Sequence, residues 1–197
     1  ERADLRARQL GELVAVDDVA FAQIAPLVVA NVQGRRWHFG EGLASTSASL
    51  TAMWAALVDA IEAVPPEERN VQVFRGFLRA TSERDRELFE RFLDESMGRP
   101  SLVEWVPVLQ LSADLDDRGC DRLIASMNNP NVPAWVFRHL GFGRATEPVP
   151  EERLVELLER LSIKPGGVAI AIDILHTHIY GEPKSIGPQL TSCAREL

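Results

Sequence analysis

Apolar residues recur every three or four positions along almost the whole chain, and the alternation typical of β-strands is scarce. The clearest case is Ser47–Val64, where six apolar side chains form one stripe of a predicted helix: Leu50, Met53, Trp54, Leu57, Ile61 and Val64. Pro65 and Pro66 end this helix because proline has no amide hydrogen to donate. The pattern predicts an all-α protein.

The same period, interrupted by polar, glycine or proline linkers, predicts about eleven helices in all. The other predicted segments are Glu1–Leu13, Leu13–Val32, Val71–Ala80, Arg86–Leu93, Trp105–Leu111, Asp116–Met127, Pro133–Leu140, Pro150–Leu161, Val168–Ile179 and Gln189–Leu197. Ser45 and Thr46 are predicted N-caps, and Ser82–Asp85 and Ser101–Glu104 resemble capping boxes. Val168–Ile179 is rich in isoleucine, as a strand would be, but its length favours a buried helix.

Two parts of the chain have similar sequences and form an internal repeat. Phe74-Arg75 and the later Arg79-Ala80-Thr81 correspond to Phe137-Arg138 and Arg144-Ala145-Thr146. The segments that follow the two copies begin at Arg86 and Arg153, and the offsets between corresponding positions range from 63 to 67 residues. A charged helix rich in Leu and Phe follows each copy, and another helix pair lies near the midpoint. The implied period is 31 to 35 residues per helical hairpin. A period of this size is typical of stacked hairpins.

With this repeat, Pro65–Leu197 resembles the HEAT and armadillo-like α-solenoid superfamily. The resemblance implies antiparallel helical hairpins stacked into a right-handed superhelix. It also implies a scaffold or recognition role, since such families mostly bind proteins and occasionally nucleic acid. Glu1–Val64 shows no such repeat, so it is expected to be a cap or part of an adjoining module.

The amino-acid composition indicates which class of protein this is and which compartment it suits. The hydrophobic fraction of 46% is typical of a folded globular protein, and no apolar run is long enough to cross a membrane. Cys120 and Cys193 lie in unlike contexts, which favours a reducing cytoplasm over a disulfide framework. The chain opens and ends within helical patterns, so we expect a piece of a larger, bacterial-type multidomain protein.

The best candidate binding surface lies in Gly34–Gly42, which is predicted to be a loop. It contains five residues of the types that binding hot spots favour: Arg35, Arg36, Trp37, His38 and Phe39. The alternative is that the two aromatic side chains enter the core while the arginines face water. The glycine spacing fits neither a phosphate-binding loop nor the dinucleotide fingerprint, and no cofactor is expected.

A metal centre is the main catalytic alternative. His176 and His178 would share one face of a strand, but they diverge by about 200° on a helix and cannot hold one ion there. On a helix Asp173 and His176 are neighbours three residues apart, an arrangement typical of a structural pair.

The leading hypothesis is therefore a protein-interaction scaffold with an unidentified protein partner. One alternative is a nucleic-acid-binding or repair-like helical repeat that uses Arg75, Arg79, Arg138 and Arg144, although the net charge of −8 disfavours phosphate binding. The second alternative is a small metal-dependent enzyme built on Asp173, His176 and His178.

Overall fold

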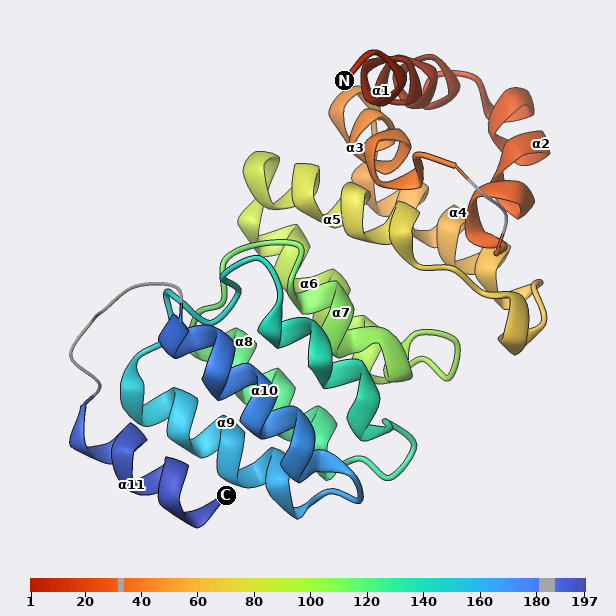
Figure 1. The fold of residues 1–197 in the computed structure, drawn as a ribbon. Coiled ribbons are helices and arrows are strands. Elements are labelled where there is room, and N and C mark those ends of the chain that lie inside the picture. Colours follow the sequence, from red (N-terminus) through yellow and green to blue (C-terminus); the bar gives the residue numbers. More distant parts are fainter. Residues whose placement is uncertain (32–33, 181–186) are drawn as a thin grey trace. The chain divides into compact units, whose positions relative to one another are not determined.

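A computed structural model describes residues 1–31, 34–180 and 187–197. Within these ranges the chain is all-α and contains no strand; one isolated bridge joins Ala30 and Arg69 (Figure 1). The α-helices are α1 (Arg2–Val14), α2 (Asp18–Val29), α3 (Arg36–Thr46), α4 (Leu50–Glu62), α5 (Gln72–Arg84), α6 (Arg86–Met97), α7 (Val106–Gln110), α8 (Asp117–Asn128), α9 (Glu151–Ile163), α10 (Gly167–Tyr180) and α11 (Pro188–Glu196). The 3₁₀ helices are η1 (Pro66–Glu68), η2 (Val103–Trp105) and η3 (Ala134–Gly141).

The chain folds into two compact units, Glu1–Ser101 and Leu102–Leu197. The division predicted between residues 64 and 65 rested on where the visible repeat begins, whereas these units divide according to which helices contact one another. The all-α prediction is confirmed. The isoleucine-rich segment forms α10, so its helical interpretation is also confirmed.

The helix boundaries correct several sequence predictions. Leu13–Val32 is not one helix, because α1 ends at Val14 and the Asp17 carboxylate caps a new helix; Val32 lies outside the described residues. Ser45 and Thr46 belong to α3, and Ser49 caps α4 instead. The six stripe residues of Ser47–Val64 are all buried, as the period predicted.

Both predicted capping boxes are wrong. α5 continues through Ser82 to Arg84, and Asp85 caps α6 by accepting a hydrogen bond from the Leu88 amide at 3.0 Å. The Ser101 hydroxyl donates to Glu62 at 3.2 Å rather than capping a helix. Asp85 and Ser101 thus each form a hydrogen bond with a residue outside the predicted four-residue motif.

The helices of the first unit form two rows. In one row α3 lies between α1 and α5, and in the other α4 contacts both α2 and α6 (Figure 1). Within the sequence, α1 contacts α2, α3 contacts α4, and α5 contacts α6. Each consecutive pair therefore contributes one helix to each row.

Glycines allow the row of α1, α3 and α5 to pack with backbones almost touching. A Cβ placed on Gly42 of α3 would lie 2.0 Å from the Arg8 carbonyl oxygen of α1. On the other side, a Cβ on Gly76 of α5 would lie 1.8 Å from the Trp37 carbonyl oxygen of α3. No side chain fits at either contact, so the residue type decides how close these helices can come.

An aromatic cluster fills the core of the first unit. The Trp54 ring of α4 stacks on Phe92 of α6 at 4.7 Å between centroids, and it meets Phe74 of α5 edge-on at 5.4 Å. All three side chains are buried. Aromatic pairs in these geometries stabilise a core beyond the area that they bury, so this cluster joins the two rows.

The second unit has a similar pairing of contacts. η3 contacts both α7 and α10, while α9 contacts α8 and α11 (Figure 1). The inner face of α9 is buried as predicted, with Leu154, Leu157, Leu158 and Leu161 inside the unit. The predicted helix Pro133–Leu140 is a 3₁₀ helix. The repeated segment Arg144–Thr146 lies in a turn, where Arg144 has a φ of 64°.

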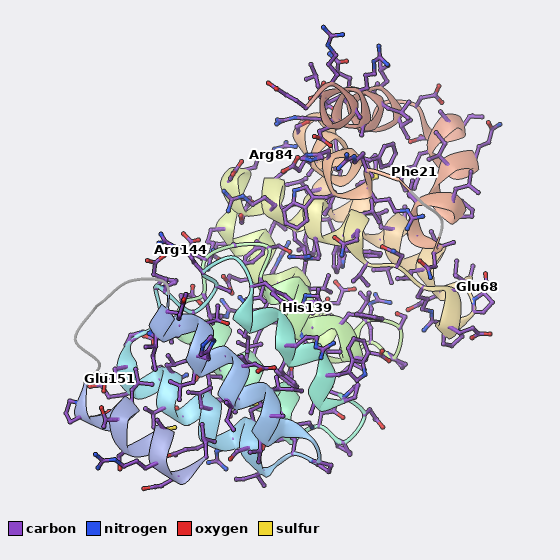
Figure 2. All side chains as sticks on the ribbon, in the orientation of Figure 1. Phe21, Glu68, Arg84, His139, Arg144 and Glu151 are labelled. Carbon is purple, nitrogen blue, oxygen red and sulfur yellow. The ribbon has the colours of Figure 1, made fainter. Side chains whose placement is uncertain are left out.

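Several helix C-termini are capped by Lys or Arg side chains that lie outside the helix itself. The Lys164 ammonium donates to the Met127 carbonyl at the end of α8 at 2.7 Å, and Arg69 donates to the Ile61 carbonyl of α4 at 3.1 Å. Arg84, labelled in Figure 2, donates to the Ala44 carbonyl of α3. Carbonyls at a helix end have no partner within the helix, and the helix dipole favours a cation there.

Glu151, also labelled in Figure 2, closes the start of α11. Its Oε1 accepts hydrogen bonds from the amides of Gln189 at 3.0 Å and Leu190 at 2.9 Å. We expect Glu151→Ala to fray α11, because removing an N-terminal capping acceptor costs about 1 kcal/mol. Thiol labelling of the native protein followed by mass spectrometry checks this: Cys193, buried on α11, should be labelled several times faster in the variant.

Cys120 is the internal control, because it is buried on α8 and does not depend on this cap. Equal acceleration at both cysteines would mean that Glu151 stabilises the whole unit rather than α11.

Candidate interaction surface

The segment predicted as a binding loop is helical. Residues 36–42 form most of α3, Arg35 is its N-cap residue, and the loop prediction for Gly34–Gly42 is therefore wrong. Two of the glycines that suggested a loop, Gly40 and Gly42, instead lie where α5 and α1 pack closely against α3. Phe39 is buried in the core, and the Arg36 side chain is only 7% exposed.

The other three candidate residues contact neighbouring helices. The Trp37 indole N–H donates to Glu41 at 2.9 Å, and His38 Nδ1 lies 2.8 Å from the other oxygen of that carboxylate. Arg35 pairs with Asp4 of α1 at 3.3 Å, and its side chain remains 66% exposed. The Arg35–Asp4 pair therefore links α1 to the start of α3, whereas the contacts of Trp37 and His38 with Glu41 lie within α3.

Arg75 extends this network to α5. Its guanidinium lies 4.8 Å from the centroid of the Trp37 ring, a distance that gives a favourable cation–π interaction. Burial lowers the pKa of Arg75, and burial has the same effect on the pKa of Arg36. Both guanidiniums nevertheless stay charged near neutral pH, since an arginine pKa begins far above it.

The four arginines suggested for nucleic-acid binding divide between the two units. Arg75 and Arg79 lie on α5, and Arg79 pairs with Glu83 at 3.1 Å. Arg138 lies on η3 and Arg144 in the following turn. Two of the four arginines therefore lie in each unit, and nucleic-acid binding stays a prediction.

The histidines of α10 point in different directions. His176 is exposed and stacks on Tyr180 at 5.4 Å between ring centroids, whereas His178 Nδ1 lies 3.0 Å from the Thr146 hydroxyl oxygen. In the described part of the chain, no three His, Cys, Asp or Glu side chains are grouped so that they could hold a metal ion. Each histidine therefore has a structural neighbour of its own.

Neither cysteine has the surroundings of a nucleophile. Both are free and buried. Burial raises the pKa of the Cys120 thiol to about 11, and it raises the pKa of Cys193 as well. A thiol with a raised pKa is protonated at neutral pH, and the protonated form is a poor nucleophile.

An exposed apolar surface occurs instead on the first two helices. Of the large hydrophobic side chains described as exposed, six lie between Leu5 and Leu27, and the other six lie in the second unit between Trp135 and Tyr180. On α2, Val19 and Leu27 are 70% and 61% exposed, and Ala22, Gln23 and Pro26 lie exposed between them. We call these five residues the outward face of α2. It contains no charged side chain.

The neighbouring surface of α1 is apolar and basic. Its exposed residues opposite α3 are Arg2, Leu5, Arg6, Gln9, Leu10 and Leu13, which we call the outward face of α1. Leu13 is 69% exposed, and Val16 in the turn to α2 is 71% exposed. Asp4 and Glu12 are half-buried, and each bonds to a residue at or within α3.

The sequence of α2 does contain a feature related to this surface, a long run without charge, but such a run predicts a buried helix and not an exposed one. From Val19 to Gln33 no charged residue occurs, so the period of the pattern predicts an apolar helix without telling which face is covered. The structure buries only Phe21, Ala25 and Val29 of α2.

No helix in the described ranges has both the length and the apolar character needed to span a membrane. Comparison with known proteins finds no matching family model, no matching curated protein and no matching solved structure.

Proposed function

We propose that this protein is a protein-binding scaffold whose partner docks on the outward faces of α1 and α2. The observation that supports this proposal is the concentration of exposed apolar side chains in the first 27 residues. Several large apolar side chains exposed on two consecutive helices are typical of an interaction site. Covering side chains of this size stabilises a complex by about 1 kcal/mol or more each.

The arrangement of the helices supports a scaffold of HEAT-like hairpins. The first helices of the successive pairs begin at residues 2, 36, 72, 106, 134 and 167, close to the period inferred from the sequence. Under this proposal residues 1–64 consist of the same kind of hairpin as the rest of the chain. Each hairpin leaves one apolar stripe for its neighbour to cover.

Site-specific crosslinking tests the docking surface. A photoreactive amino acid placed at Val19 or Leu27 in the native cell should give discrete protein adducts, whereas one at Glu87, exposed on α6 of the same unit, should not. The partner identified in this way is then purified, and its affinity is measured by calorimetry. Apolar burial predicts a negative heat-capacity change on binding.

The decisive variant is the double substitution Val19→Asp and Leu27→Asp. It should lower the affinity for the purified partner by about a hundredfold, since two exposed apolar contacts are replaced by charges. Glu87→Ala should bind as the parent protein does. A partner that binds the double variant with unchanged affinity would refute this surface.

A further inference from the structure

We infer that the partner of the α1 surface is an acidic amphipathic segment of another protein. This inference rests on the proposed function and adds the charge of the ligand to it. It follows from how charged groups are distributed around α1 in a chain whose net charge is −8.

The charges of α1 are separated by face. Arg8 donates to Glu12 at 3.4 Å, Asp4 pairs with Arg35, and these groups lie on the side that meets α3. Arg2 and Arg6 are exposed on the outward face and form no ion pair with any residue in the described ranges.

The leucines of the same face complete an amphipathic binding surface. Leu5 and Leu13 lie eight residues apart, within about 80° of one another around the helix. Arg2 and Arg6 share this face and lie on either side of Leu5 along the helix, so positive charge lies at the N-terminal end of the apolar surface. The complement is a helix or extended segment with apolar anchors bordered by Glu or Asp, since complementary charges at a rim favour the correct partner.

A second copy of this chain fits the surface less well. A two-fold symmetric contact would place the outward face of α1 against itself. Such a contact offers Arg2 and Arg6 no acidic partner, because the outward face that each copy contributes contains no carboxylate.

An anionic membrane surface also fits less well. Attachment through basic side chains uses clusters of roughly four to eight Lys or Arg, whereas this face has two arginines.

A peptide library provides the test. Helical peptides with leucines fixed at three- and four-residue spacing, and with Glu, Gln or Lys varied at the flanking positions, are selected against the full chain. We expect the selected peptides to be enriched in Glu, and the best of them to bind Arg2→Gln/Arg6→Gln about fivefold more weakly. Arg8→Gln is the matched control, because Arg8 faces α3 and is already paired; it should bind as the parent does.

Each other outcome contradicts the inference. Selection of neutral or lysine-rich peptides, no enrichment, or unchanged binding to the double arginine variant would show that acidic groups are not recognised. Binding of phosphatidylserine vesicles without peptide selection would identify a membrane surface, and dimerisation that is lost with Leu13→Asp would identify a second copy. The proposed function fails separately, through the crosslinking experiment on α2, so the two results can be distinguished.

Discussion

Gly76→Ala is expected to destabilise the first unit by about 3 kcal/mol or more. The added methyl group would lie 1.8 Å from the Trp37 carbonyl oxygen and 2.7 Å from its carbon, so the backbones of α3 and α5 must move apart. Overpacking a close contact of this kind costs about 1 to 3 kcal/mol when only side chains must adjust, and more when the backbone must shift. The movement would also separate Arg75 from the Trp37 ring.

Gly98→Ala is the matched control within the same unit. A Cβ at Gly98 meets nothing closer than the Glu95 carbonyl oxygen at 3.7 Å, and the residue has a right-handed helical conformation. Its stability should be unchanged or slightly higher, because alanine restricts the unfolded chain. Urea denaturation followed by far-UV circular dichroism compares the two variants, and equal stability would contradict the close packing of α3 against α5.

Trp54→Ala should lower the free energy of unfolding of the first unit by about 3 to 5 kcal/mol, the range for truncating a buried large aromatic residue. The side chain is 1% exposed and stacks on Phe92 at 4.7 Å. Its indole N–H also donates to Glu95 at 3.2 Å, and that hydrogen bond is lost as well. Because Trp54 joins helices of both rows, we expect α4, α5 and α6 to lose protection together.

Hydrogen exchange measured by mass spectrometry checks this second result. Peptides from all three helices should exchange faster in the variant. Leu27→Ala is the control, because it removes an apolar side chain that is 61% exposed, and such a change should alter stability by less than about 0.5 kcal/mol. Loss of protection confined to α4 would mean that the cluster does not couple the rows.

The sequence predicted the elements whose burial follows a simple period. The stripe from Leu50 to Val64 and the leucines of α9 are buried as expected, because one face of an amphipathic helix must be covered whatever covers it. Helix α10 could also be predicted, since its length exceeds that of a typical strand. Capping was less predictable, because a side chain such as Ser101 has several possible acceptors and only the fold brings Glu62 within reach.

The segment Gly34–Gly42 shows what the sequence alone did not determine. Its glycines allow both a flexible turn and a helix packed closely between two others, and local preference favours the turn. The packing of α1 and α5 against α3 decides for the helix, because only residues without side chains permit that approach. The exposed surface has the same origin: the sequence made α2 apolar almost all round, and the tertiary structure decided which face remained uncovered, since neighbouring helices reach only the side of Phe21, Ala25 and Val29.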